Sequence, residues 1–134
     1  MPITLNQLLG LQLSYGLVGM AFNIVSWAVV KQGGVALTTT PPLIGMAAMF
    51  LFCLCLIAGY RRHMVAYRTL MGIAILALGV GGILVHLVNM SYRPEAYSSV
   101  IAWALAVLIN VFGLLLNLIA ANGKFVDRRA IPLG

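Results

Sequence analysis

Residues 69–92 read TLMGIAILALGVGGILVHLVNMSY, and this stretch decides the fold. It carries no acidic or strongly basic side chain, and it is longer than the roughly 20 apolar residues a helix needs to cross a bilayer. We therefore expect a membrane-spanning helix here. His86 is the only ionisable residue that would lie well inside any span of this protein.

Three more uncharged stretches of comparable length surround it, at 1–30, 32–60 and 96–123. Of the 134 residues, 63% are hydrophobic and only 7% are charged, which excludes an ordinary soluble domain. The sequence predicts an all-α membrane protein, a compact four-transmembrane-helix bundle with up-down-up-down connections and no soluble domain. The single domain, 1–134, would contain spans at about 6–30, 41–60, 66–90 and 96–121, followed by a basic tail at 122–134.

Basic residues gather on one side of this predicted topology. Six of the eight lie at the turn between spans two and three or in the tail, namely Arg61, Arg62, Arg68, Lys124, Arg128 and Arg129. Lys31 and Arg93 fall on the opposite side. The positive-inside rule then places both termini in the cytoplasm, and we expect a bacterial inner membrane. The first apolar run lacks a basic n-region and a cleavage site, so we expect it to remain as a span.

Local signals predict where the helices begin and end. Thr4 and Gln7 have the spacing of a capping box, in which each residue bonds the other's backbone N–H. A cap residue followed by proline starts helix two at Thr40 and Pro41, and a proline and an acid start helix four at Pro94 and Glu95. Glycine is favoured just after a helix, which places the last end at Gly123.

Each span has one stripe of small and polar residues, which marks the face turned toward other helices. The polar interior residues are Gln12 and Asn23 on the first span and Asn110 and Asn117 on the fourth. An amide left unpaired in hydrocarbon costs several kcal/mol, so we expect these side chains to find partners. Asn23 and Asn110 both fall near mid-membrane, and a hydrogen bond between the two is the simplest arrangement.

His86 is a candidate ligand-binding residue, because ionisable residues within a membrane are often functional. Gly79 and Gly82 precede it at helical spacing and leave a groove suited to a flat ring. The spacing from Gly82 to His86 resembles the small-xxx-His element by which light-harvesting helices hold chlorophyll-type pigments. That resemblance, over five residues, implies a tetrapyrrole held by an axial His86 nitrogen. A haem with two histidine ligands from one chain is excluded, because His63 lies about 34 Å away along the helix.

Two other interpretations of His86 remain open. The favoured one is structural, with the imidazole bonded to a partner on helix four or helix one. The other is a Cu(I) site, since thioether and imidazole ligands suit that ion. Its candidate ligands are Met46, Met49, His86 and Met90.

The two carboxylates, Glu95 and Asp127, lie outside the spans, so paired-acid hydrolysis and a proton-coupled exchanger with an acid in its first helix are not expected. We therefore expect no enzyme. Nucleic-acid binding is not expected either, because the cations sit where topology places them.

Two function classes remain. The first is a non-catalytic accessory subunit of a larger respiratory or photosynthetic electron-transfer complex, contacting a pigment, haem, quinone or lipid. Structural lipids and other membrane subunits would be its partners. The alternative is a small homo-oligomeric channel or transporter for a neutral or weakly polar solute, with its pathway between protomers.

Overall fold

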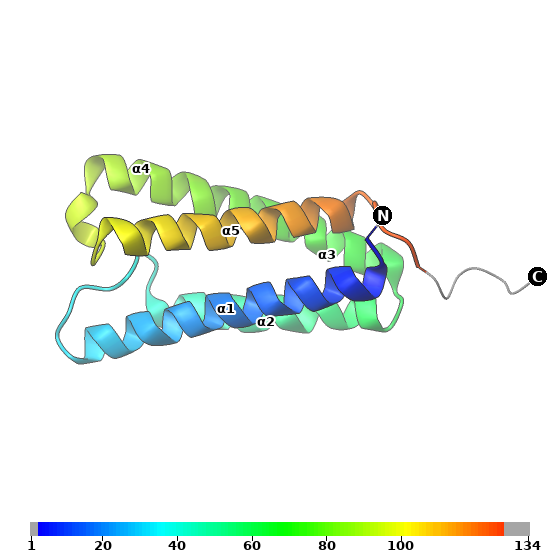
Figure 1. Cartoon of the computed structure of the whole chain (residues 1–134), viewed down its shortest axis with the longest axis horizontal. Coiled ribbons are helices and arrows are strands. Elements are labelled where there is room, and N and C mark those ends of the chain that lie inside the picture. The colour runs from blue at the N-terminus through cyan, green and yellow to red at the C-terminus, as the bar shows by residue number, and fades with distance from the viewer. Residues whose placement is uncertain (1–2, 128–134) are drawn as a thin grey trace, which may run out of the picture.

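The computed structural model describes residues 3–127, and these form helices joined by short connections (Figure 1). Four helices are long and apolar enough to cross a membrane, at Leu5–Lys31, Pro42–Tyr60, Met64–Tyr92 and Val100–Ala121. The third is composite: α3 (Met64–Ala77) continues through the π-helical segment η1 (Leu78–Leu84) into α4 (Val85–Tyr92). The others are α1 (Leu5–Lys31), α2 (Pro42–Tyr60) and α5 (Val100–Ala121), with a short 3₁₀ turn η2 (Pro94–Ala96) before α5.

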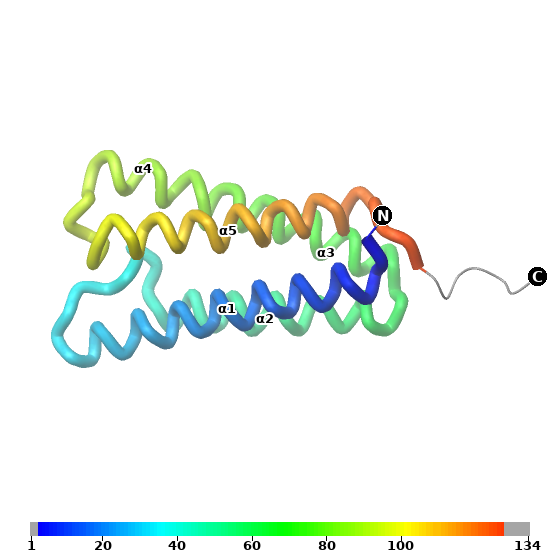
Figure 2. Tube along the Cα trace, in the orientation of Figure 1, coloured from blue at the N-terminus to red at the C-terminus, as the bar shows by residue number. Residues whose placement is uncertain are grey.

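The four long helices pack around a common axis. α1 packs on α2, α2 on α3, α3 and η1 on α5, and α5 back on α1. Figure 2 shows the connections 32–41 and 93–99 at one end of the molecule, which we call the loop end. The start of α1, the turn at 61–63 and the segment after α5 lie at the other end, which we call the terminal end.

The apolar core lies mainly toward the terminal end. It is built from the start of α1, the end of α2, the start of α3 and the end of α5, and its most buried members include Leu5, Leu8, Leu9, Leu56, Tyr67, Met71 and Ala120. The outer faces of the four long helices expose many large apolar side chains, as lipid-facing helices do. Burial along α1 confirms that a stripe of small and polar residues faces inward, and the predicted Gln12 and Asn23 lie on it with Gly16, Gly19 and Ser26.

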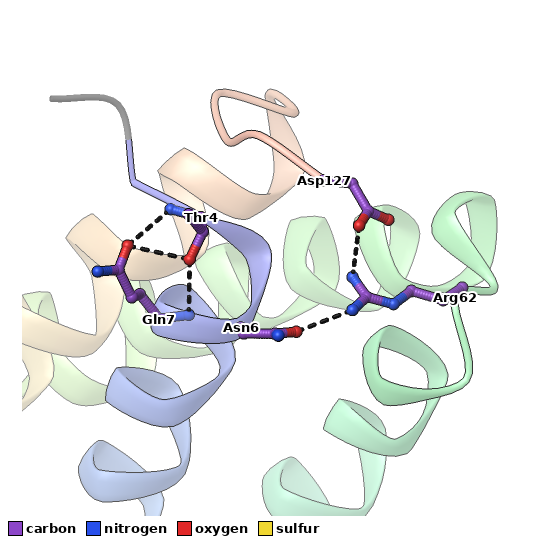
Figure 3. Close-up of polar contacts among 5 residues, drawn as sticks. All are labelled: Thr4, Asn6, Gln7, Arg62 and Asp127. Carbon is purple, nitrogen blue, oxygen red and sulfur yellow. Dashed lines mark hydrogen bonds and ion pairs between the residues drawn. The ribbon is translucent and has the colours of Figure 1, made fainter. Parts of the chain in front are cut away.

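The helix ends agree with the sequence in part. The predicted capping box is confirmed, since Thr4 Oγ1 accepts from the Gln7 backbone N–H while Gln7 Oε1 accepts from the Thr4 backbone N–H (Figure 3). The predicted cap of helix two is one residue early, because Pro41 occupies the cap position and Pro42 begins the helix.

The predicted start of helix four is wrong. Pro94 and Glu95 form the 3₁₀ turn η2, and α5 begins only at Val100. The physical reason is a better cap: Ser99 is extended and its hydroxyl accepts the Ala102 N–H at 3.1 Å.

Polar contacts join three segments at the terminal end. Arg62, which adopts a left-handed backbone conformation with φ 61°, donates to Asn6 Oδ1 at 2.8 Å and pairs with Asp127 at 3.0 Å (Figure 3). Val126 pairs with the segment around Thr4 through backbone hydrogen bonds to Ile3 and Leu5. These contacts fasten the end of the described chain to the start of α1. Arg128 and Arg129, predicted in the basic tail, lie outside the described residues.

Candidate functional site

The loop half of the bundle contains a cavity of about 240 Å³ lined by all four long helices and by the 32–41 connection. Its walls are mostly small or apolar side chains, among them Gly19, Phe22, Gly45, Met49, Leu78, Ile109 and Ala106. Three of the five polar residues predicted from the sequence line it: Asn23 from α1, His86 from α4 and Asn110 from α5. An apolar cavity with a few converging polar groups is the usual form of a small-molecule site.

The two asparagines do not bond each other, so that prediction is wrong. Asn23 Nδ2 donates to the Gly19 carbonyl at 2.8 Å, and Asn110 Nδ2 donates to the Ala106 carbonyl at 2.9 Å. Each amide thus satisfies itself on its own helix, four residues back, and needs no partner across the bundle. Both remain in the cavity wall.

His86 is held from one side by groups near the start of α5. Its Nδ1 lies 3.0 Å from the Tyr97 hydroxyl, and that hydroxyl also lies 3.3 Å from the His86 carbonyl oxygen. Trp103 Nε1 donates to the same carbonyl at 3.0 Å. His86 is 4% exposed, and its other ring nitrogen, Nε2, makes no hydrogen bond with residues 3–127. The structural interpretation of His86 expected a partner on another helix; the partner observed is Tyr97, which precedes α5 instead of lying within it.

The cavity extends toward the loop end. Thr38 and Thr40 line both it and a shallower depression between the 35–41 segment and α4, where Asn89 donates to Thr39 Oγ1 at 3.0 Å. Backbone hydrogen bonds hold this end together, since Ser98 N–H donates to the Ala36 carbonyl at 3.0 Å.

A layer of buried polar groups closes the bundle on the side of the cavity that faces the terminal end. Gln12 donates to Asn117 Oδ1 at 2.8 Å and accepts from the Tyr67 hydroxyl at 2.5 Å, and all three residues are 0% exposed. Tyr15, one turn along α1 from Gln12, donates its hydroxyl hydrogen to Asn110 Oδ1 at 3.5 Å. We call Gln12, Tyr67 and Asn117 the polar floor. The structure thus brings Asn23, His86 and Asn110 into the cavity and places Gln12 and Asn117 beneath it.

The glycine groove predicted for a tetrapyrrole is not formed as expected. Gly82 is covered by Asn110, whose side chain lies within 2.6 Å of the position that a Cβ would take there. Gly79 does not line the cavity, whereas Gly81 does. The reason is η1, because i→i+5 bonding, as from Val85 N–H to the Val80 carbonyl, turns less per residue and moves Gly79 off the His86 face.

The cavity volume also argues against a tetrapyrrole. Pockets for drug-sized ligands have volumes of about 300–1,000 Å³, so a cavity of about 240 Å³ is too small to enclose a macrocycle.

The four predicted copper ligands do not all line the same cavity. Met49 and His86 line the cavity, whereas Met46 and Met90 do not. Within residues 3–127 no group of three or more His, Cys, Asp or Glu side chains is placed to hold a metal ion.

Three aromatic residues of the site were not among the sequence candidates. Tyr97 and Trp103 hydrogen-bond to His86, and the Tyr15 hydroxyl donates to Asn110 Oδ1. Of the three, Tyr15 had a signal in the sequence, because it lies three residues after Gln12 and four before Gly19 and therefore shares their helix face.

No family model, curated protein or solved structure matches this chain. Its function must be inferred from the geometry of the site. The cavity offers amides, hydroxyls and an imidazole within apolar walls, a set typical of small-molecule sites.

Proposed function

We propose that this chain is an integral membrane protein whose bundle holds a small, mainly apolar molecule with one uncharged polar group. The observation that carries the proposal is the cavity lined by four helices, with Asn23, His86 and Asn110 in its wall. Its walls favour apolar groups, and its uncharged amides would leave a full ionic charge poorly compensated. We further propose that the chain acts as a non-catalytic subunit of a larger membrane assembly, in which this molecule or a lipid lies at the bundle.

The distribution of charge supports one orientation of the protein in the membrane. Arg61, Arg62, Arg68 and Lys124 lie at the terminal end, whereas Lys31 and Arg93 lie at the loop end. Under the positive-inside rule the terminal end is cytoplasmic, and the cavity faces the outside of a bacterial inner membrane. The four spans would then cross the membrane in an up-down-up-down arrangement.

Purification in a mild detergent tests both parts of the proposal. Native mass spectrometry of the full chain measures the mass of its assembly, and organic extraction identifies bound small molecules. We expect a fixed stoichiometry with larger subunits and one uncharged molecule per chain. A bare monomer or homo-oligomer without any extractable molecule would contradict the proposal.

A second candidate function, transport of a neutral solute, is favoured by one observation. The cavity reaches Thr38 and Thr40 at the loop end, while the polar floor closes the bundle on the opposite side. A site accessible from one side only is what one state of an alternating transporter would present. The pathway would then lie within a protomer and not between protomers. Uptake of solute into liposomes by a purified homo-oligomer would favour this function over the subunit.

A further inference from the structure

We infer that the cavity selects a molecule that donates a hydrogen bond, and that Nε2 of His86 is the acceptor. This inference rests on the proposed function and specifies its ligand class: an O–H or N–H group on an apolar body. A molecule of the same shape whose polar group is a ketone would bind less well. The argument depends on where the imidazole carries its proton.

We assign that proton from two contacts around Tyr97, by asking which arrangement supplies a hydrogen to both. The Tyr97 hydroxyl has a single hydrogen, and its oxygen lies near two atoms of His86: the carbonyl oxygen at 3.3 Å and Nδ1 at 3.0 Å. A carbonyl oxygen can only accept, so its contact with Tyr97 is a hydrogen bond only if the Tyr97 hydrogen is donated to it. The Nδ1 contact is then satisfied only if Nδ1 carries a hydrogen and donates to the Tyr97 oxygen. The opposite tautomer would leave two acceptors facing each other across 3.3 Å.

A neutral imidazole with its hydrogen on Nδ1 has a lone pair on Nε2. Nε2 has no partner among residues 3–127, although His86 is 4% exposed and lines the cavity. A ligand O–H or N–H placed here would supply the donor that residues 3–127 do not give to Nε2.

The asparagine amides do not impose the same selection. Asn23 and Asn110 each donate one N–H to a carbonyl of their own helix, which fixes their orientation and leaves the second N–H over. The Asn23 oxygen is also left over, and Asn110 Oδ1, which accepts from the Tyr15 hydroxyl at 3.5 Å, keeps a second lone pair. Each can therefore accept from a ligand or donate to it. His86 Nε2 can only accept, which makes it the group that discriminates.

Nuclear magnetic resonance of the full chain in lipid nanodiscs, with ¹⁵N-labelled histidine, tests this inference at about pH 8, where an ordinary histidine is neutral. The probes are cyclohexanol and cyclohexanone, which share a shape but not the hydroxyl. His63, which is exposed at the terminal end, reports unspecific effects in the same sample. We expect an unprotonated His86 Nε2 whose resonance shifts on adding cyclohexanol, and a preference of about fivefold for the alcohol over the ketone.

Two variants sharpen the test. His86→Leu should equalise the affinities for the two probes, whereas His63→Leu should leave the preference unchanged. Should His86→Leu fail to fold, Tyr97→Phe serves instead, since loss of the hydroxyl should allow a hydrogen on Nε2 and lower the preference. A protonated Nε2 in the parent chain, or equal binding of both probes, overturns the inference and leaves the proposed binding function standing. Binding of neither probe overturns both.

Discussion

Replacing Gln12 with methionine probes how much the polar floor contributes to stability. Methionine keeps the length and the unbranched shape of glutamine but removes its amide. In the parent chain Gln12 Oε1 accepts from Tyr67 and Gln12 Nε2 donates to Asn117, with all three side chains 0% exposed. Gln12→Met therefore leaves the Tyr67 hydroxyl and Asn117 Oδ1 buried without partners.

Each stranded polar group costs about 1–3 kcal/mol, although interhelical bonds in membranes average only about 0.6 kcal/mol because the unfolded chain also finds partners. We expect Gln12→Met to lower the free energy of unfolding by about 2–4 kcal/mol. Tyr67→Phe strands only Gln12 Oε1 and should cost about half as much. Asn117→Leu should cost least, because it also removes Asn117 Nδ2, a buried donor without a hydrogen-bond partner.

Unfolding by SDS in mixed micelles, followed by circular dichroism, measures these differences. The decisive comparison is the double variant Gln12→Met with Tyr67→Phe. It removes both members of one hydrogen bond, so its cost should be well below the sum of the single variants. Additive costs would refute the reasoning that these side chains form one network.

Three further predictions follow from local geometry. Ser99→Ala should lower the free energy of unfolding by about 1 kcal/mol and speed hydrogen exchange in the first turn of α5, because the cap of that turn is lost. Unchanged exchange would contradict the observed start of α5. Gly82→Ala should destabilise the bundle by about 1–3 kcal/mol, because a Cβ there would meet Asn110. Its control, Gly79→Ala, should be neutral or stabilising, because no atom lies within 4 Å of the added Cβ. Equal effects of the two variants in thermal unfolding would count against this packing. In a chain without other cysteines, Gly34→Cys should react with a membrane-impermeant maleimide added outside intact cells; labelling only after lysis would reverse the proposed topology.

Much of the fold could be predicted because it depends on properties that a sequence displays directly. Charge-free runs of sufficient length predict four helices, and the helical period identifies the buried face of α1 down to Gln12 and Asn23. The capping box at Thr4 also depends on residues only three apart, so its signal is local.

The details of the site could not be predicted, because they depend on competition between distant and local partners. Asn23 and Asn110 have carbonyls of their own helices within reach, and no sequence pattern tells which partner an amide chooses. The π-helical turn η1 changes which glycine faces His86, and a calculation at a constant 100° per residue cannot anticipate it. The late start of α5 likewise brings Tyr97 to His86 from a connection.

The central claim, that the cavity binds a small molecule, is tested most directly by filling it. Ile109 lines the cavity, whereas its neighbour Leu108 is 63% exposed on the outside of α5. Tryptophan at position 109 should occupy the cavity, and the same residue at position 108 should not. With cyclohexanol binding measured in nanodiscs, we predict that Ile109→Trp abolishes binding and that Leu108→Trp retains it. Undiminished binding by a folded Ile109→Trp protein would contradict the account.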